Sequence, residues 1–387
     1  MNCKNEIKLS SEITKDVYTD YIQEHFDLQV EDVMSEKIPF NFDIKELSDW
    51  NIGLICGGSG SGKTTILKKL GNIVEPTFDE SKSLISNFSS LPPSEAVSLL
   101  CSVGLCSVPT WLKPFHVLSN GEMYRARLAK SVYDAKEGEI ILVDEFTSVV
   151  DRDVAKTMSF AVQKLIRKKN LRIVFASCHY DIIEWLMPNW IYDLNKGGVL
   201  EKYDSARRPT IELQMYRTET DTWEMFKKHH YMTEELNKSA ACYVFTWNDK
   251  VVAFVGVLPQ PSGYYEKGVR GTRTVVLPSF QGIGIGSKVT EFVASIYKAD
   301  GYRYFTKTVN PKLGEYRSRS ENWLATAKNG RPIRKSNSKL NKKQKLRASY
   351  CHEYVGKPLR GCQDVIQNIK YMRETKNGYK QLCLFDF

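Results

Sequence analysis

The sequence predicts an α/β protein of two domains, and three observations carry the prediction. An apolar stretch, a glycine-rich turn and a helix-forming segment follow one another over residues 50–70. A second glycine-rich turn, at residues 281–287, again separates an apolar stretch from a helical one. The 387 residues also exceed the ~100–200 residues of a typical domain. We therefore expect domains at 1–205 and 206–360, with a C-terminal extension at 361–387.

The composition is that of an ordinary globular protein, 42% hydrophobic and 26% charged. No apolar run approaches the ~18 residues of a membrane span, and the nine cysteines form no C-x-x-C pair, so we expect a cytoplasmic protein with free thiols and no membrane partner. Residues 1–205 carry 23 basic against 29 acidic side chains, whereas residues 206–387 carry 32 against 16. This asymmetry favours a nucleic-acid partner for the second half, and a generally basic surface is the alternative.

The first glycine-rich turn fits the pattern G-x-x-x-x-G-K-[ST]. Glycines let the backbone curl so that successive N–H groups reach phosphate oxygens at a helix N-terminus. In this pattern the lysine reaches the β and γ phosphates of ATP, and the following hydroxyl binds Mg²⁺. The predicted ATP contacts are Gly57, Gly58, Ser59, Gly60, Ser61, Gly62, Lys63, Thr64 and Thr65.

Two further segments suit a phosphate-binding fold. Ser119, Asn120 and Gly121 precede a helical run and offer a second anion-binding helix start, although an ordinary helix cap looks the same. The apolar strand at 139–143 ends in Asp144 and Glu145. An aspartate at this position binds Mg²⁺ beside a P-loop, and the adjacent glutamate is placed to polarise the attacking water.

Asp151 and His179 complete the series. Asp151 follows the paired carboxylates, and His179 ends the next apolar strand, where a histidine can sense a γ phosphate or serve only the structure. Together these motifs, in this order over residues ~35–205, resemble the ABC-type ATPases. The resemblance implies an α/β P-loop ABC-type ATPase domain with Glu145 and His179 as catalytic residues, Thr64 and Asp144 as Mg²⁺ ligands, and Asp151 near ATP.

The same resemblance implies a head-to-tail homodimer, in which residues 119–121 of one chain cap the γ phosphate held by Lys63 of the other. The sequence departs from the family in one respect, since no glutamine lies between Thr65 and Leu118. That segment is also shorter than the arm with which transporter cassettes dock on membrane subunits. A transporter ATP-binding subunit is therefore the third and least favoured interpretation.

The second half predicts a different fold. We expect a strand at 211–216, a helix at 222–230, paired strands at 240–247 and 251–257, a strand at 272–277, a helix to about 298 and a strand at 302–309. This order and the turn Q-x-x-G-x-G resemble the GNAT acyltransferases, which implies an α+β GNAT-like acyltransferase domain that binds an acyl-CoA such as acetyl-CoA. The implied contacts are Val276, Leu277, Gln281, Gly282, Ile283, Gly284, Ile285, Gly286 and Ser287.

The general base of this domain is not identified, because the strand at 272–277 holds no carboxylate. Tyr316 could serve as a general acid, and an ordinary surface residue is an equally good interpretation. Residues 331–347 hold eight basic and no acidic side chains, which suits a segment lying along phosphates or a solvated loop. By general pattern this half also resembles Mom-type DNA modification proteins.

We therefore interpret the chain as an ABC-type ATPase coupled to a GNAT-like acyltransferase that acts on nucleic acid, DNA or RNA. The alternative is an ATP-dependent nucleic-acid clamp or sensor whose GNAT-like domain only binds.

Overall fold

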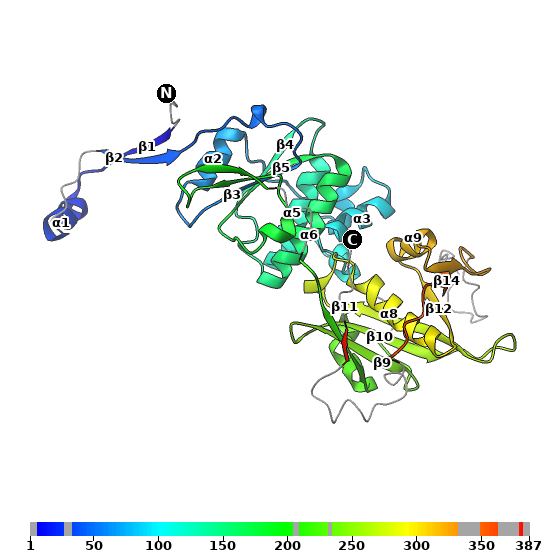
Figure 1. The fold of residues 1–387 in the computed structure, drawn as a ribbon. Helices are drawn as coiled ribbons and strands as arrows, with labels where there is room; N and C mark the ends of the chain where they lie inside the picture. Colours follow the sequence, from blue (N-terminus) through cyan, green and yellow to red (C-terminus); the bar gives the residue numbers. More distant parts are fainter. Residues whose placement is uncertain are drawn as a thin grey trace. The chain divides into compact units, whose positions relative to one another are not determined.

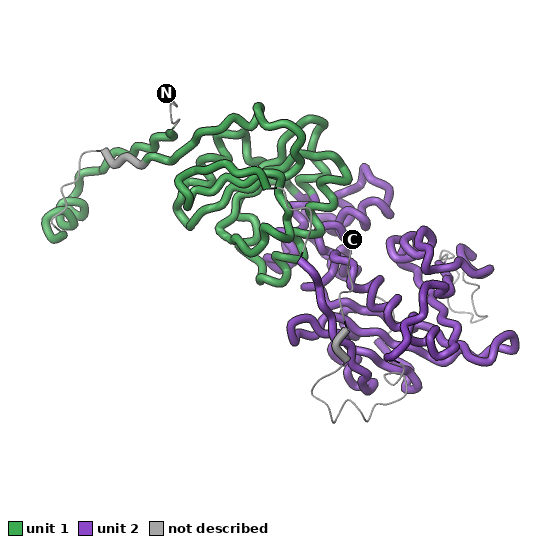
Figure 2. The backbone as a smooth tube through the Cα atoms, in the orientation of Figure 1, with its two compact units in different colours: residues 1–77, 130–208 green, residues 78–129, 209–387 purple. Residues whose placement is uncertain are grey.

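A computed structural model describes residues 6–26, 33–203, 209–230, 234–331, 349–362 and 379–381. The chain divides into two compact units, residues 1–77 with 130–208 and residues 78–129 with 209–387 (Figure 2). Segment 78–129, expected within the first domain, thus groups with the second half. Most of the basic segment at 331–347 lies outside the described residues, as do residues 204–208 and 382–387.

The first unit is built on a five-stranded sheet in the order β4-β5-β3-β6-β7 (Figure 1). The strands β3 (Ile52–Cys56), β4 (Ile140–Val143), β5 (Arg172–Ser177) and β6 (Trp190–Asp193) are parallel, and β7 (Val199–Lys202) is antiparallel to β6. All five residues of β3 are buried, as expected for a central strand of a parallel sheet. The phosphate loop therefore starts from the buried centre of this sheet.

The helices of this unit are α2 (Lys63–Leu70), α6 (Arg152–Lys169), α7 (Ile183–Leu186) and the last residues of α5 (Asn120–Asp134), together with the 3-10 helix η1 (Ile44–Glu46). An N-terminal hairpin joins β1 (Glu6–Glu12) to β2 (Val33–Pro39) through α1 (Val17–Phe26), which buries none of its residues. Ile38 of β2 is 2% exposed and packs on the phosphate loop, where it nearly touches Gly62.

The second unit contains an eight-stranded sheet in the order β13-β14-β12-β11-β10-β9-β8-β15. Its strands are β8 (Leu213–Thr218), β9 (Ala241–Trp247), β10 (Lys250–Pro259), β11 (Gly268–Val276), β12 (Arg303–Thr308), β13 (Trp323–Ala325), β14 (Tyr350–Tyr354) and β15 (Tyr379–Gln381). Helix α8 (Ile285–Ala299) packs on β10, β11 and β12 (Figure 1), and α9 (Pro311–Arg319) packs on β13 and β14.

Segment 78–129 is helical, with η2 (Leu84–Phe88), α3 (Pro93–Ser102), α4 (Val108–Leu112), η3 (Phe115–Val117) and the start of α5. Among the described residues no helix is long and apolar enough to cross a membrane.

One expected helix is wrong. Residues 222–230 form two 3-10 helices, η4 (Thr220–Met225) and η5 (Lys227–His229). Trp223 and Phe226 are the buried residues here, 3% and 0% exposed, and their spacing of three matches the 3-10 period rather than the α period. A further 3-10 helix, η6 (Pro278–Phe280), leads from β11 into the second glycine turn. The strand expected at 272–277 begins earlier, at Gly268.

Candidate functional site

The phosphate loop connects β3 to α2 as the sequence predicts. Gly60 and Gly62 have φ values of 76° and 90°, in the left-handed region that favours glycine. The Lys63 ammonium donates to the carbonyl oxygens of Gly57, at 2.9 Å, and Gly58. The hydroxyl oxygen of Ser61 is buried and has no hydrogen-bond partner among the described residues. A loop with an unsatisfied hydroxyl and a lysine turned onto its own carbonyls fits a phosphate group.

Thr64 and Asp144 meet across two elements of the sheet. The Thr64 hydroxyl donates to Oδ2 of Asp144 at 2.6 Å, although the two residues are eighty positions apart. The other Asp144 oxygen accepts the N–H of Glu145 at 2.8 Å. Among the described residues no group of three His, Cys, Asp or Glu could hold a metal ion. This donor set fits Mg²⁺, which uses one or two protein ligands together with substrate phosphates.

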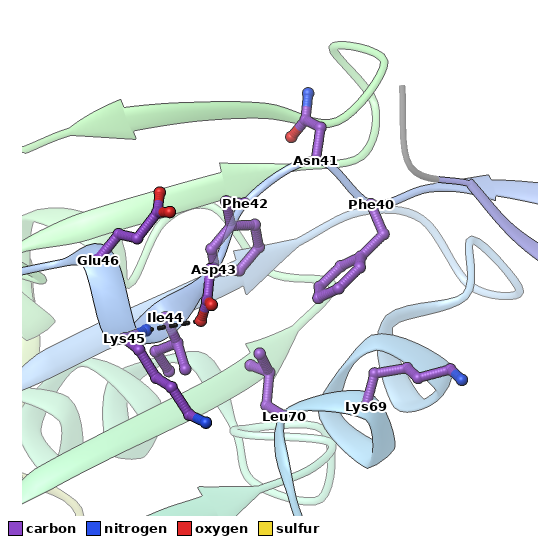
Figure 3. Close-up of a pocket in the computed structure, with 9 residues that line it drawn as sticks. All are labelled: Phe40, Asn41, Phe42, Asp43, Ile44, Lys45, Glu46, Lys69 and Leu70. Carbon is purple, nitrogen blue, oxygen red and sulfur yellow. Dashed lines mark hydrogen bonds between the residues drawn. The ribbon is translucent and has the colours of Figure 1, made fainter. Parts of the chain in front are cut away.

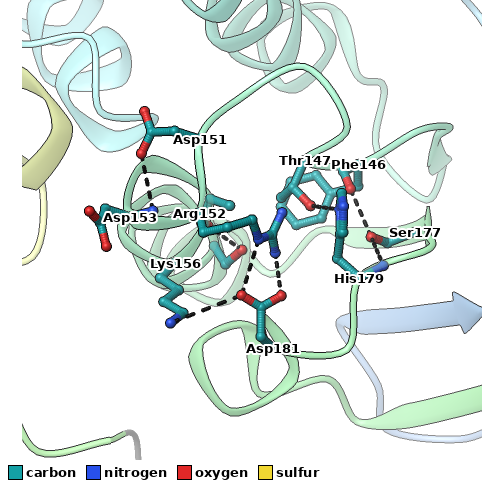
Figure 4. Close-up of polar contacts among 11 residues, drawn as sticks. Phe146, Thr147, Asp151, Arg152, Asp153, Lys156, Ser177, His179 and Asp181 are labelled. Carbon is teal, nitrogen blue, oxygen red and sulfur yellow. Dashed lines mark hydrogen bonds and ion pairs between the residues drawn. The ribbon is translucent and has the colours of Figure 1, made fainter.

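Glu145 and His179 lie on neighbouring loops at the carboxyl ends of β4 and β5. Glu145 is exposed and has φ 49°, an uncommon backbone conformation for glutamate. The Thr147 hydroxyl and Nδ1 of His179 lie 3.1 Å apart (Figure 4). Ser177 ties the two loops together, since its hydroxyl donates to the carbonyl of Phe146 at 2.8 Å and accepts the His179 N–H at 3.1 Å. Burial, aided by the Arg152 charge, lowers the pKa of His179.

The start of α6 is fixed by two carboxylates. Asp151 caps the helix, accepting the N–H groups of Asp153 and Val154 at 3.1 and 3.0 Å. Arg152 donates through Nε to Asp181 at 3.1 Å and through Nη2 to its other oxygen (Figure 4). Burial would raise the pKa of Asp181, but the Arg152 hydrogen bonds and charge lower it. The predicted ATP contact Asp151 is thus held rigidly at the helix start.

A hydrogen-bond network that the sequence did not reveal contacts the phosphate loop through Gly58. The Gly58 N–H donates to Oδ1 of Asn195 at 3.0 Å. The N–H of Asn195 donates to Asp193 at 3.0 Å, and the same carboxylate oxygen accepts the Tyr180 hydroxyl at 2.7 Å. Asp193 is 4% exposed. These bonds link the residue after His179 to the phosphate loop.

Two aromatic residues before the loop, Phe40 and Phe42, lie side by side and line the same pocket. The Phe42 ring packs on Trp190 and Tyr192, with centroid distances of 5.5 and 4.7 Å. Phe40 lines a pocket of about 580 Å³ together with charged side chains that include Lys69 (Figure 3). Phe40 also packs against the core of this unit.

Ser119, Asn120 and Gly121 lie at the start of α5, in the second unit. The Ser119 N–H and hydroxyl both donate to Oε2 of Glu122, at 3.0 and 2.9 Å, so the segment forms part of a capping box. The other Glu122 oxygen accepts the Thr110 hydroxyl at 2.9 Å. Burial would raise the pKa of Glu122, but these hydrogen bonds lower it.

The second glycine turn has the same backbone conformation as the first. Gly284 caps α8 with φ 90° and ψ 0°, and Gly282 has φ 91°. The Gln281 amide donates to the Val276 carbonyl at 2.7 Å, and the Leu277 N–H donates to Val252 at 2.9 Å. The side chains of Ile283 and Ile285 are buried, so only their backbone groups are available to a ligand, as are those of Gly286 and Ser287 in the first turn of α8.

Strands β11 and β12 diverge beside this turn. They pair in parallel only from Gly268 to Gly271, opposite 303–306. At that point the register of β10 against β11 shifts, and Thr272 is left without a partner residue in β10. Bulges of this kind redirect a strand and are frequent beside active sites. The divergence leaves a cleft of about 130 Å³ between the two strands.

Tyr316 is not one of the residues that line this cleft. Its hydroxyl donates to the buried carboxylate of Glu291 at 3.0 Å, which also accepts Nε1 of Trp323 at 3.0 Å. Burial and the Glu291 charge raise the pKa of Tyr316 to about 12. The phenol therefore stays protonated at neutral pH.

Parts of this chain are similar to known proteins. Residues 210–315 match the family model of the acetyltransferase (GNAT) family. No curated protein matches the chain. Among solved structures, the dimeric ATP-binding cassette MJ0796 bound to ADP and Pi is 16% identical, covering 46% of this chain and 95% of that chain with a TM-score of 0.34. A Bacillus subtilis acetyltransferase in complex with CoA is 13% identical, covering 37% and 97% with a TM-score of 0.27. A putative metal-chelate type ABC transporter is 18% identical, covering 48% and 86% with a TM-score of 0.32.

Proposed function

We propose that an ABC-type ATPase and a GNAT-like N-acyltransferase act together in this chain on nucleic acid. The observation that carries the proposal is the repeated turn. Gly62 and Gly284 each follow a strand of their unit's sheet, each has φ 90° with ψ near 0°, and each begins a helix. Such a turn directs backbone N–H groups and the positive end of a helix at an anion. One turn suits the phosphates of ATP and the other the pyrophosphate of an acyl-CoA.

In the first site, Lys63 and the loop amides would hold ATP, and Thr64 with Asp144 would hold Mg²⁺, which supplies charge neutralisation on the phosphates when bound. Glu145 would accept a proton from the attacking water, and neutral His179 would contact the γ phosphate. The exposed Ser119 and Asn120 would complete this site in a second copy of the chain, which makes the active ATPase a homodimer.

In the second site, the N–H groups from Gly282 to Ser287 would hold the acyl-CoA pyrophosphate, and the arm of the cofactor would enter between β11 and β12. Strand β11 offers no carboxylate to act as a general base, so the base of this site is not assigned. The 32 basic against 16 acidic residues of the second half favour nucleic acid as the acceptor, with acetyl-CoA as the simplest donor.

A direct test combines purified protein, ATP, Mg²⁺ and labelled acetyl-CoA with DNA, RNA or a basic protein. We expect label to appear in nucleic acid and ATP to be hydrolysed. Hydrolysis without transfer to any of the three acceptors would reject the acyltransferase.

A nucleic-acid clamp with a binding-only GNAT-like domain is the second candidate, because the cleft lining contains no carboxylate to act as a base. Calorimetry with CoA separates the two proposals, since the clamp need not bind CoA.

A further inference from the structure

Thr147 has a backbone conformation that its residue type disfavours. Its φ is 73°, in the left-handed region, which a β-branched residue rarely adopts. The residue is also 0% exposed, so its hydroxyl is shielded from water. A strained residue persists only where its surroundings hold it, and such residues cluster at functional sites. The strain at Thr147 therefore directs attention to what its side chain contacts.

Hydrogen bonds beside Thr147 fasten its loop to the end of β5. The Phe146 N–H donates to the Ala176 carbonyl at 2.8 Å. The Phe146 carbonyl accepts the Ser177 hydroxyl at 2.8 Å, and the same hydroxyl oxygen accepts the His179 N–H at 3.1 Å. The loops after β4 and β5 are therefore joined, and the Thr147 side chain points at the His179 ring (Figure 4).

The Thr147 hydroxyl has one hydrogen-bond partner within the part of the chain that the structure describes. It lies 3.1 Å from Nδ1 of His179, and a histidine nitrogen can donate or accept at that distance. If Nδ1 carried the proton, the hydroxyl hydrogen of Thr147 would be buried without an acceptor. Buried donors are costly to leave unpaired, so the hydroxyl donates and Nδ1 accepts. The neutral ring then carries its proton on Nε2.

The position of this proton matters because the His179 ring is neutral at physiological pH. Burial lowers the pKa of His179 below its ordinary value, and the Arg152 charge lowers it further, whereas the Asp181 charge opposes the shift. A doubly protonated ring donates from both nitrogens, but a neutral ring donates from one only. The tautomer therefore decides whether His179 can donate to an anionic oxygen on the side away from Thr147.

His179 leaves the sheet at the same edge as the phosphate loop. Strands β5 and β3 are parallel neighbours, and Ser177 at the end of β5 pairs with Cys56 at the end of β3. Gly57, the first residue of the phosphate loop, follows Cys56 directly, and His179 lies two residues beyond Ser177. The two loops thus start level with each other. An anion held by the phosphate loop would therefore lie at the sheet edge that His179 occupies.

We propose that Thr147 is a positioning residue that fixes His179 in the Nε2–H tautomer, so that this nitrogen donates a hydrogen bond to the terminal phosphate of the bound nucleotide. The inference rests on the proposed ATPase function and goes beyond it by naming the group that sets the state of His179. No covalent bond changes, since Thr147 keeps its proton and acts only through the ring.

Two substitutions separate the hydroxyl of Thr147 from the shape of its side chain. Thr147→Val keeps the β-branched shape, and with it the backbone strain, but removes the hydroxyl. Thr147→Ser keeps the hydroxyl and is the matched control. In the full-length protein, ¹⁵N-labelled histidine reports the tautomer, because protonated and unprotonated ring nitrogens differ widely in chemical shift. His179→Gln identifies the signal among the six histidines.

We expect the parent and Thr147→Ser to carry the His179 proton on Nε2. Thr147→Val should show a mixture of the two tautomers, and it should lower kcat for ATP hydrolysis about tenfold while leaving KM nearly unchanged. Thr147→Ser should retain most of the parent kcat.

A parent that carries the proton on Nδ1 would overturn the inference, and this measurement needs no folded Thr147 variant. An unchanged tautomer or an unchanged kcat in Thr147→Val would overturn it as well. If the parent hydrolysed no ATP, the proposed ATPase would fail, but the tautomer of His179 would still decide whether Thr147 fixes it.

Discussion

The two left-handed glycines of the phosphate loop offer a matched pair of substitutions. Gly60 and Gly62 have φ values of 76° and 90°, so alanine at either position costs about 1–2 kcal/mol for the left-handed backbone. Their surroundings differ. A Cβ at Gly60 would meet no atom within 4 Å, whereas a Cβ at Gly62 would lie 2.4 Å from Cδ1 of Ile38 and 2.8 Å from its Cγ1.

The overlap at Gly62 adds a second cost. Carbon atoms pack at roughly 3.5–4.0 Å, so Ile38 has to move by more than 1 Å, and overpacking of a filled site costs about 1–3 kcal/mol. We expect Gly60→Ala to lose about 1–2 kcal/mol of unfolding free energy and Gly62→Ala about 2–5 kcal/mol. Because Gly62 begins α2 directly before Lys63, Gly62→Ala should also weaken ATP binding at least tenfold.

Urea denaturation measures the loss of unfolding free energy, and ATP titration measures the loss of affinity. Both are applied to Gly60→Ala, Gly62→Ala, Ile38→Ala and the double variant Ile38→Ala/Gly62→Ala. In the double variant the new Cβ at position 62 no longer meets the Ile38 side chain. The double variant should therefore lose less unfolding free energy than the sum of the losses in Ile38→Ala and Gly62→Ala. Equal losses for the two glycine variants, or strict additivity with Ile38→Ala, would refute the packing of β2 on the phosphate loop.

The remaining predictions concern the ATPase. Lys63→Ala should abolish ATP binding, whereas Glu145→Gln should retain ATP and accumulate as a dimer in size-exclusion chromatography; native hydrolysis by Glu145→Gln would contradict its role. Tyr180→Phe removes a donor from the buried Asp193 carboxylate, which costs about 1.5–3 kcal/mol, and it should raise the KM for ATP more than it lowers kcat; an unchanged KM would separate this network from the phosphate loop. The pKa of His179 is lowered, so the unfolded chain binds the extra proton first, and stability should fall as the pH drops below 6.5. The pKa values of His229 and His352 are lowered as well, so His179→Gln should reduce this slope in urea titrations at pH 5–8 without removing it.

Local steric and hydrogen-bonding signals explain what the sequence could predict. Both glycine turns were predictable because φ near 90° and a following helix depend on residues within one segment. The cap formed by Ser119 and Glu122 is equally local. The Thr64–Asp144 pair spans eighty residues, but the parallel sheet brings the carboxyl ends of β3 and β4 to one edge. Recognising the two strands in the sequence was therefore enough to predict this pair.

Other features depend on contacts that no local pattern encodes. Asn195 meets the Gly58 N–H across 137 positions, and nothing in its neighbourhood distinguishes it from a turn asparagine. The Tyr316 hydroxyl is held by Glu291 on another helix. The cleft itself arises because β11 and β12 pair over four residues and then diverge, which is a property of strand register rather than of composition.

The divergence of β11 and β12 also bears on the choice between a transferase and a clamp. A sheet that only binds a strand of nucleic acid gains nothing from losing ladder hydrogen bonds in its middle, because buried backbone groups are costly to leave unpaired. Here the bulge at Thr272 and the loss of pairing after Gly271 fall beside the glycine turn that begins α8. Backbone groups freed at that place can be satisfied by an extended ligand between the strands, with its anionic end at the turn. The strand register therefore agrees with the proposed transferase more closely than with the proposed clamp.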